Sequence, residues 1–385
     1  MIPYGRQSIS QADISNVVEV LQSDYLTQGP IVPQFEEKVC RLVGARYAVA
    51  LNSATSALHV ACLALGLEEG DYLWTSAITF VASANCGLYC GANVDFVDIN
   101  PLTFNICPVA LEKKLREAKS SGVLPKVVVV VHLCGQPADL FAIHELSKEY
   151  GFKIIEDASH AIGAHYRETS IGDCRYSDAA VFSFHPVKIV TTGEGGVATT
   201  NDALVAEKMS RLRTHGITRD AGNMSGEPEG PWYYEQIDLG FNYRMTDLAA
   251  ALGISQLDRL QEFISARHRV ADRYEGLLKG LPVHTPWVSP DCFSSYHLYV
   301  INVEGHDVVQ TRLATFQKLR AAGVAVNIHY IPVYRQPIYK KMGFQDGYCP
   351  NAEAYYASAI SLPIFPGLTI EDQDFVAQSL RTALA

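Results

Sequence analysis

The chain has 385 residues, 48% of them hydrophobic and 19% charged, and its 31 basic and 41 acidic side chains leave a formal net charge of −10. This composition supports a sizeable core and excludes a disordered or collagen-like chain. The length favours two domains, because single cores stop growing at about 250–300 residues. The acidic balance argues against a protein that binds nucleic acid or an anionic membrane.

The sequence shows no targeting or membrane-spanning pattern. The first ten residues, MIPYGRQSIS, lack the basic and then apolar pattern of a secretory signal. The uncharged stretches 48–67 and 72–94 are interrupted by Ser, Asn and Gly, so neither predicts a membrane helix. Nine cysteines without a CxxC pair are typical of a reducing compartment, and Cys86 and Cys90 lack the further ligands of a zinc site. We expect a soluble cytoplasmic protein without a metal ion.

The first two thirds of the chain alternate strand-like and helix-like segments, which predicts parallel βαβ construction. The first strand is expected at 47–51, followed by an Ala/Leu-rich helix to residue 65. Further strands are expected at 72–76, 94–99, 127–131 and 153–155, with the clearest helices at 109–118 and 140–150. The five valines at 127–131 indicate a strand buried on both faces. Shorter strands at 179–184 and 197–200 flank a glycine-rich turn.

The last third has a different pattern. A long helical segment is expected at 245–278, followed by a strand at 296–303, a helix at 310–322 and a terminal helix after residue 368. We therefore predict an α/β protein. Residues 1–259 form a large domain with a mostly parallel sheet, and residues 260–385 form a smaller α+β domain.

Lys188 is the first candidate for chemistry. It ends the segment SFHPVK (183–188), which lies between two apolar strands, and TTGEGG (191–196) follows it. A crowded lysine can lose its proton and form a Schiff base with a carbonyl compound. The glycines allow a ligand to approach the backbone closely. The alternative is a solvated loop lysine, which describes most lysines.

The segment IIEDASHA (154–161) ends an apolar strand in a carboxylate, at the edge where open α/β sheets bind ligands. If Lys188 holds pyridoxal phosphate, Asp157 is placed to keep the pyridine nitrogen protonated, so that the ring can accept electrons. His160 would then contact the ring oxygen or the ring face. The alternatives are a helix N-cap at Asp157 and an ordinary packed histidine at His160.

Two further segments follow predicted strands. Residues 52–57, NSATSA, link a strand to a helix, and backbone N–H groups at a helix N-terminus, aided by hydroxyls, bind phosphate. Many such caps bind no phosphate, so this signal is weak by itself. Phe80 can stack on a planar cofactor, although a core position is the simpler interpretation.

The segment GEGGVA (193–198) formally matches the GxGxxA form of the dinucleotide fingerprint. That fingerprint needs a strand before it and a helix opening within it. Here polar residues precede the glycines and residues 197–200 are expected to be extended, so we reject a nicotinamide site.

Together these segments resemble the fold-type I pyridoxal phosphate aminotransferases that act on nucleotide-linked sugars, the DegT/DnrJ/EryC1/StrS family. The resemblance covers nearly the whole chain. Its markers, in chain order, are LTQGP (26–30), NSATSAL (52–58), TFVAS (79–83), EDASHAIGA (156–164), SFHPVK (183–188), TTGEGG (191–196), RTHGITRD (213–220) and GFNYRMTDLAAALG (240–253). Each marker is weak alone, and all of them in this order are highly specific.

The resemblance implies a role for each matching residue at the cofactor. Lys188 is the Schiff-base lysine and moves the proton, and Asp157 faces the pyridine nitrogen. The other implied cofactor contacts are His160 at the ring hydroxyl, Phe80 on the ring face, and Thr55, Ser56 and Ser183 at the phosphate. Many relatives carry glutamine at the position of His160, a departure that adjusts cofactor contacts and leaves the lysine in place.

The resemblance also implies residues that come from a partner subunit or contact the substrate. Asn242 reaches the phosphate from the partner, which implies a homodimer with shared active sites. The implied contacts to the nucleotide diphosphate or sugar are Tyr243, Arg244 and His329. For Arg213 and Arg219, a structural role and a substrate contact are equally compatible with the sequence.

Among the branches of the family, MIPYGRQSI, SDYLTQGP, SFHPVK and TTGEGG most resemble the one that aminates C4 of a UDP-linked 4-keto-6-deoxy-N-acetylhexosamine, with L-glutamate as amino donor, in pseudaminic acid biosynthesis. A sister group dehydrates sugars with histidine in place of the lysine, and Lys188 argues against that chemistry. The alternatives are another ketosugar, such as UDP-4-keto-arabinose or a dTDP-4-keto-6-deoxyhexose, a non-catalytic regulator that binds pyridoxal phosphate or a sugar nucleotide, and a scaffold protein.

Overall fold

A seven-stranded sheet forms the centre of the protein in the computed structural model, which describes all 385 residues. Its strands lie in the order β1-β9-β8-β5-β4-β2-β3. Their bounds are β1 Tyr47–Leu51, β2 Tyr72–Ser76, β3 Asn93–Val97, β4 Val127–Val131, β5 Lys153–Asp157, β8 Ala179–Ser183 and β9 Gly196–Thr200. The neighbours from β8 to β3 are parallel, and β9 is antiparallel to both β1 and β8. The predicted α/β class with a mostly parallel sheet is confirmed.

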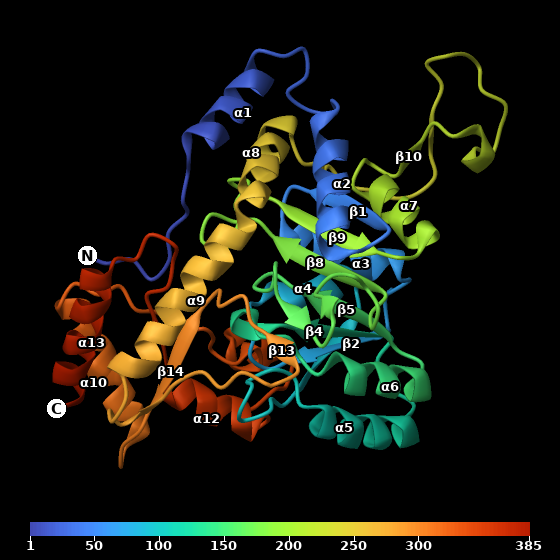
Figure 1. Cartoon of the computed structure of the whole chain (residues 1–385). Coiled ribbons are helices and arrows are strands. Elements are labelled where there is room, and N and C mark those ends of the chain that lie inside the picture. The colour runs from blue at the N-terminus through green and yellow to red at the C-terminus, as the bar shows by residue number, and fades with distance from the viewer.

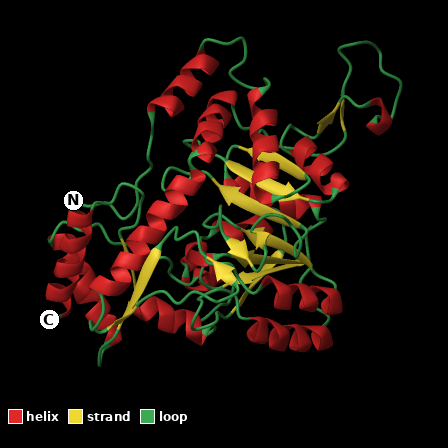
Figure 2. Cartoon of the chain, viewed as in Figure 1, coloured by secondary structure: helices red, strands yellow, loops and turns green.

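Helices cover both faces of this sheet (Figure 2). One face packs against α2 (Ile31–Val43), α5 (Pro108–Ser121), α6 (Leu140–Tyr150) and α8 (Asp247–Asp258), and the other against α3 (Ala54–Ala64), α4 (Ala82–Tyr89) and α7 (Ala203–Leu212). The valines of β4 alternate between the two cores, with Val128 and Val130 in the first and Val127 and Val129 in the second. This alternation is the side-chain period of a strand, and it explains why the run contains no polar residue.

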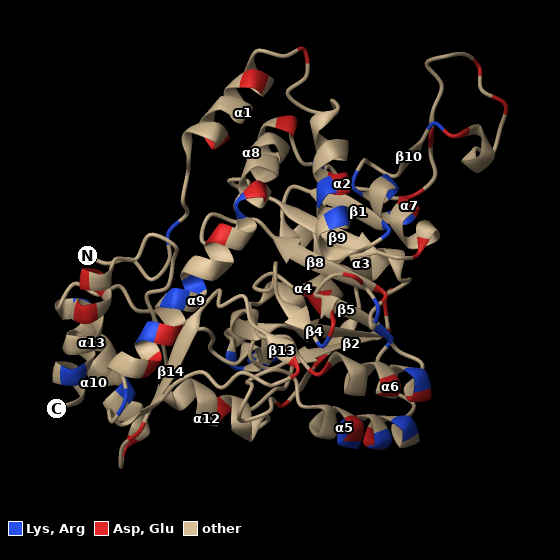
Figure 3. Ribbon diagram, viewed as in Figure 1, with Lys and Arg blue, Asp and Glu red and all other residues tan.

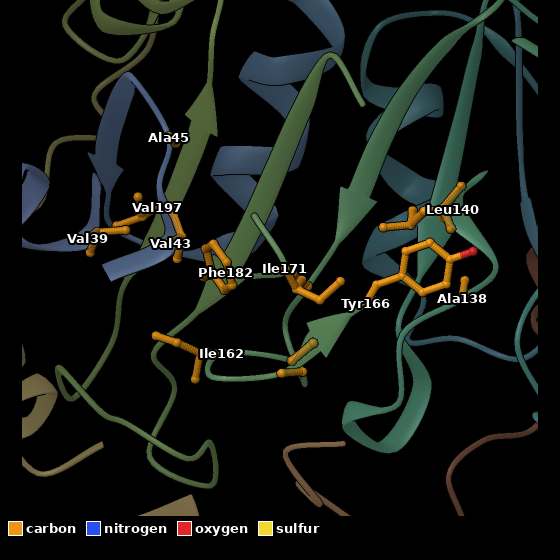
Figure 4. Close-up of a cluster of buried hydrophobic side chains, with 14 of the residues drawn as sticks. Val39, Val43, Ala45, Ala138, Leu140, Ile162, Tyr166, Ile171, Phe182 and Val197 are labelled. Carbon is orange, nitrogen blue, oxygen red and sulfur yellow. The ribbon is translucent and has the colours of Figure 1, made fainter. Parts of the chain in front are cut away.

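Figure 4 shows part of the first core, where α2 and the strands meet. Val39 and Val43 of α2 lie near Val197 of β9 and Phe182 of β8. All four side chains are at most 3% exposed. Burial of such side chains contributes about 1.5–3 kcal/mol each, so this layer stabilises the strand ends that carry the site.

Helix boundaries follow from local chemistry. The N-cap of α3 is Ser53, whose side chain accepts a hydrogen bond from the Ser56 N–H. The helix α6 begins after the capping side chain of Asp139 and ends at Gly151, whose φ of 80° lies in the left-handed region that favours glycine. The helix α1 (Gln11–Leu21) begins with a capping box of Ser10 and Asp13.

The second unit contains an antiparallel sheet of β12 (Val283–His284), β14 (Tyr299–Val303) and β15 (Ala359–Leu362). The helices α10 (Val308–Ala321), α12 (Pro350–Ser358) and α13 (Ile370–Leu384) accompany it. The remaining short elements are β6 His165–Tyr166, β7 Thr169–Ser170, β10 Ile217–Thr218, β11 Glu235–Gln236, β13 Cys292–Phe293 and α11 Pro337–Lys341.

The helix α9 (Leu260–Leu277) runs between the two units (Figure 1). Phe263 and Ile264 pack in the core of the large sheet, whereas Val270 and Tyr274 pack in the core of the second unit. The N-terminal residues also join the second unit, because the Ile2 N–H donates to the Gly323 carbonyl and the Ile364 N–H donates to the Tyr4 carbonyl. A domain boundary at 259/260 stays a prediction.

The long helix expected at 245–278 is wrong in one respect, since the structure has two helices that meet at Arg259. The backbone of Arg259 leaves the helical region, with φ −100° and ψ 5°. Its guanidinium contacts Glu262, the carbonyl of Ser8 and the buried carboxylate of Asp13. Arginine is a good helix former, so the residue type at position 259 does not predict an interruption of the helix. These side-chain contacts explain the interruption. The strands at 47–51, 72–76 and 127–131 have the predicted bounds.

Charged side chains lie on the outer helices, with both signs interspersed along α5 (Figure 3). No helix combines the length and the apolar character that a membrane crossing requires.

Candidate active site

A cavity of about 780 Å³ opens where the strands β4, β5 and β8 end. The last residue of each strand lines it, namely Val131, Asp157 and Ser183. In open α/β sheets this carboxyl edge is the usual ligand site. Eight of the predicted site residues line the cavity: Thr55, Ser56, Phe80, Asp157, His160, Ser183, Lys188 and His329. They come from five separate segments of the chain.

Lys188 lies in the turn between β8 and β9. Its backbone N–H donates to the His185 carbonyl, and the Phe184 N–H donates to the Gly195 carbonyl, so the turn is closed at both ends. Burial lowers the pKa of the Lys188 amine to about 8, and the charge of Asp157 opposes this shift. A larger fraction of the amine is therefore neutral near pH 7 than in an exposed lysine. Lys188 is only partly exposed and lines the cavity, which argues against the alternative of a freely solvated loop lysine.

Asp157 is the last residue of β5 and is 6% exposed. Its Oδ2 accepts a hydrogen bond from the Ser83 hydroxyl at 2.6 Å, and its Oδ1 accepts one from the Ser159 N–H at 3.1 Å. Turns, and no helix, follow the strand, so the helix N-cap alternative is wrong. The carboxylate lines the cavity with lone pairs that remain free to accept a proton donor.

Three buried histidines, at 160, 297 and 329, line the same cavity as Lys188. The Cys134 N–H donates to Nδ1 of His160 at 3.3 Å, so Nε2 of His160 carries the hydrogen and donates to the Tyr330 hydroxyl at 3.2 Å. Burial and the nearby Lys188 charge lower the pKa of His329 to about 4. Burial also holds the pKa of His160 well below its ordinary value. Both imidazoles are therefore neutral at pH 7.

The N-terminus of α3 forms an anion cradle at one end of the cavity. Ser53, Ala54, Thr55 and Ser56 line it, and the Ser56 hydroxyl donates to Asn52 Oδ1 at 2.7 Å. The strand β9 approaches this backbone so closely that a Cβ at Gly196 would lie 2.4 Å from the Ala54 nitrogen. A helix N-terminus presents N–H groups and a partial positive charge, which suits a phosphate.

The expectation that residues 197–200 are extended is confirmed at the same place. Residues Gly196–Thr200 form the strand β9, and no helix opens within the GEGGVA segment.

Phe80 lines the cavity and its side chain is 57% exposed. Its ring centroid lies 6.1 Å from that of Tyr330. The core position considered for Phe80 is wrong, because an aromatic residue this exposed faces the cavity with an open ring surface.

Asn242, Tyr243 and Arg244 do not line this cavity. Asn242 bridges Thr214, and the Tyr243 ring stacks on Phe241 at a centroid distance of 4.8 Å. Arg244 lines a neighbouring cavity that shares Asn52 and Glu194 with the first. The predicted phosphate contact of Asn242 depends on a second subunit. It stays a prediction, as do the substrate contacts of Tyr243 and Arg244.

Arg213 has structural contacts in this fold. Its guanidinium pairs with Glu36 and donates to the Ala50 carbonyl at 2.7 Å.

Several residues of the cavity are not predicted from the sequence, among them Tyr4, His297, Asn327 and Tyr330. Tyr330 directly follows His329 and could have been found from that spacing. His297 lies between apolar residues in SSYHLYV, a pattern that favours a packed side chain. Its Nδ1 is buried without a hydrogen-bond partner, which only the folded chain reveals.

These residues fit pyridoxal phosphate. The cavity holds an amine of lowered pKa, a buried carboxylate with free lone pairs, an open aromatic ring and an anion cradle. Each group matches one chemical feature of the cofactor: its carbonyl, its ring nitrogen, its planar face and its phosphate.

Comparison with known proteins agrees with this geometry. The model of the DegT/DnrJ/EryC1/StrS aminotransferase family matches residues 7–381. The chain belongs to this family. Its enzyme class is therefore that of the aminotransferases, and its fold is shared with structures of that class at TM-scores near 0.9.

Named relatives of this aminotransferase are similar to it over nearly the whole chain. The chain is 38% identical to the spore coat polysaccharide biosynthesis protein SpsC of Bacillus subtilis, over 99% of this chain and 96% of that protein. It is 36% identical to the UDP-4-amino-4,6-dideoxy-N-acetyl-beta-L-altrosamine transaminase of Campylobacter jejuni, over 100% of this chain and 98% of that one.

Solved structures cover the same length. PseC of Helicobacter pylori, an aminotransferase of pseudaminic acid biosynthesis, superposes with a TM-score of 0.90 at 30% identity, over 100% of this chain and 99% of that one. A sugar aminotransferase of Streptococcus pneumoniae, Spr1654, gives a TM-score of 0.91 at 30% identity with the same coverage.

Proposed function

We propose that this aminotransferase uses pyridoxal phosphate to convert a UDP-linked 4-keto-6-deoxy-N-acetylhexosamine, UDP-2-acetamido-2,6-dideoxy-β-L-arabino-hexos-4-ulose, into its 4-amino sugar. L-Glutamate supplies the amine and leaves as 2-oxoglutarate. The observation that carries the proposal is the convergence of the Lys188 amine, the Asp157 carboxylate and the α3 cradle on one cavity. The names of the Campylobacter and Helicobacter relatives support the sugar and its place in pseudaminic acid biosynthesis.

Different residues of the cavity serve different parts of the cofactor. When bound, pyridoxal phosphate supplies a carbonyl group and a ring that accepts electrons. Lys188 Nζ holds the cofactor and moves the proton. Asp157 keeps a proton on the ring nitrogen, and Thr55, Ser56 and Ser183 hold the phosphate.

The surrounding side chains orient the substrates and limit water. Phe80 covers one face of the ring, and neutral His160 donates its Nε2 hydrogen to Tyr330. His329 faces the sugar nucleotide from the second unit of the chain. Positioning of two substrates in one cavity contributes much of the rate gain of such enzymes.

The first test is spectroscopic. Purified protein with pyridoxal phosphate should show the visible absorption of a lysine-bound cofactor, and L-glutamate alone should convert it to the amine form. Lys188→Ala should remove the band and reduce transamination by at least about 10⁴-fold, since it removes both attachment and proton transfer. Lys153→Ala, which alters an exposed ion pair with Asp178, is the matched control. A wild-type protein without the band would refute the proposal.

The sugar needs its own assay. Conversion of the UDP-linked 4-ketosugar, followed by mass and NMR analysis of the product, should show an amine at C4. A second candidate is another ketosugar of polysaccharide assembly, and the similarity to SpsC favours it. A rate at least tenfold higher with UDP-4-keto-arabinose or a dTDP-4-keto-6-deoxyhexose would replace our choice of sugar and leave the transaminase unchanged.

The proposal includes a homodimer with shared active sites, located in the cytoplasm, where all nine cysteines stay free. Asn242 and Arg244 lie outside the cavity of their own chain, which is what residues contributed to a partner require. Lys188→Ala and Asn242→Ala subunits are each expected to be inactive alone. Mixed and reassembled, they should recover about a quarter of wild-type activity, because half of the dimers then contain one intact site. No recovery in a mixture that does form heterodimers would contradict shared sites.

A further inference from the structure

The carboxylate of Asp157 is held by a side chain from a distant element. Ser83 lies in the first turn of α4, 74 positions before Asp157 in the chain, and its hydroxyl is 2.6 Å from Asp157 Oδ2. The Ser83 side chain is fully buried. Thr79, in the segment that leads into α4, places its Oγ1 2.6 Å from the Ser83 oxygen and also lines the cavity.

The direction of these two hydrogen bonds follows from the acceptor. An ionised carboxylate only accepts, so the Ser83 hydrogen points to Asp157. The Ser83 oxygen then receives the hydrogen of Thr79. Both hydroxyl hydrogens are therefore oriented toward Asp157, and hydrogen bonds in such a chain strengthen one another.

The same turn of α4 is connected to the aromatic face of the cavity. The Ser83 N–H donates to the Phe80 carbonyl at 3.2 Å, which ties the backbone of Phe80 to the residue that holds Asp157. On the other side of the carboxylate, the Ser159 N–H fixes Oδ1. With both oxygens fixed, the remaining lone pairs of Asp157 point in one direction relative to Phe80.

We propose that Ser83, supported by Thr79, is a positioning residue that aims the Asp157 carboxylate at the ring nitrogen of the cofactor and so keeps that nitrogen protonated. This inference rests on the cofactor in the proposed function and is independent of the sugar. Neither residue touches the reacting atoms. Their effect passes through Asp157, because a carboxylate free to rotate would meet the ring nitrogen in only part of its orientations.

The test compares three substitutions at Ser83 with a matched control. Ser83→Ala removes the donor, Ser83→Cys keeps the approximate size with a weak donor, and Ser83→Thr keeps the hydroxyl. The control is Ser177→Ala, which removes a partly buried hydroxyl from the neighbouring carboxylate of Glu156. Thr79→Val, which keeps the shape without the hydroxyl, should give a smaller change than Ser83→Ala.

Three readouts separate positioning from general structural damage. The ¹⁵N chemical shift of bound, ¹⁵N-labelled pyridoxal phosphate should show a smaller protonated fraction of the ring nitrogen in Ser83→Ala and Ser83→Cys. The cofactor should dissociate faster, and the half-reaction with L-glutamate should slow, each by about 10- to 100-fold, the range expected for loss of a hydrogen bond to a charged group. Ser83→Thr should restore wild-type values.

The inference is overturned if the ¹⁵N shift of Ser83→Ala equals that of wild type, or if Ser177→Ala changes it equally. It is also overturned if Ser83→Thr binds the cofactor but fails to restore the shift. A failure of the proposed function has a different signature, because wild-type protein would then give no cofactor signal or no reaction with glutamate. Circular dichroism of each variant confirms that the compared proteins are folded.

Discussion

Glu156 and Asp157 are adjacent acidic residues at the end of β5, and the structure uses them in opposite ways. Successive residues of a strand face opposite sides of the sheet. Glu156, 1% exposed, contacts His132 at 2.9 Å and the Ser177 hydroxyl at 2.5 Å, and it does not line the cavity. Asp157 also receives two hydrogen bonds, yet it borders the cavity. The same chemical group is thus structural on one face and available to a ligand on the other.

The same contrast applies to two histidines, one away from the cavity with both ring nitrogens hydrogen-bonded and one at the cavity with a ring nitrogen that lacks a protein partner. His132 is saturated, because its Nδ1 accepts from the Ala138 N–H and its Nε2 donates to Glu156. His297, on the cavity side, has a buried Nδ1 without a partner. Unsatisfied buried polar groups cost free energy, and they are retained where a ligand completes them. The following substitutions test this division.

Of the two adjacent carboxylates, Asp157 is expected to have the larger effect on the reaction rate, tested by Asp157→Asn. The amide has nearly the same shape but no charge to keep the ring nitrogen protonated, so the half-reaction with L-glutamate should slow by about 10²–10³-fold. Stopped-flow absorbance measures this rate, and a thermal melt without cofactor should differ little from wild type. A variant that melts much earlier but reacts normally would reverse the assigned roles.

The pH dependence of cofactor attachment should follow Lys188. Because burial lowers its pKa to about 8, the neutral, nucleophilic amine is the minor form below that pH and the major form above it. The rate of cofactor capture by the apoprotein should rise about tenfold per pH unit below pH 8 and level off above it. Rates are read from absorbance after rapid mixing. A rise that continues to pH 10 would indicate an ordinary exposed lysine.

Glu156→Ala should change stability and leave the chemistry nearly intact. It deprives the buried His132 Nε2–H of its acceptor, which should lower the free energy of unfolding by about 1–3 kcal/mol. Urea denaturation measures this, and the glutamate half-reaction per folded molecule should stay within a few-fold of wild type. Glu156→Gln, which can still bond both neighbours, is the milder comparison. A large loss of rate with unchanged stability would show that Glu156 also serves the reaction.

Much of the fold was accessible to sequence reasoning because the relevant signals are local. The valine run of β4 and the hydroxyl residues that open α3 depend on contacts within a few positions. The pairing of β9 with β1 and the break at Arg259 were not accessible. The strand β1 lies about 150 positions before β9, and the break depends on the N-terminal residues that Arg259 contacts.

The sequence by itself determined the chemistry that the protein carries: a lysine after β8, a carboxylate at the end of β5, and hydroxyls and free N–H groups at the start of α3. Only the tertiary structure decided which side chains complete them. Ser83 reaches Asp157 across 74 positions, and Tyr330 reaches His160 across 170. Such contacts form only when the sheet brings the strand ends to one edge and the second unit of the chain packs against that edge. No local sequence pattern predicts this packing, because the free energy that stabilises it comes from burial of the whole core.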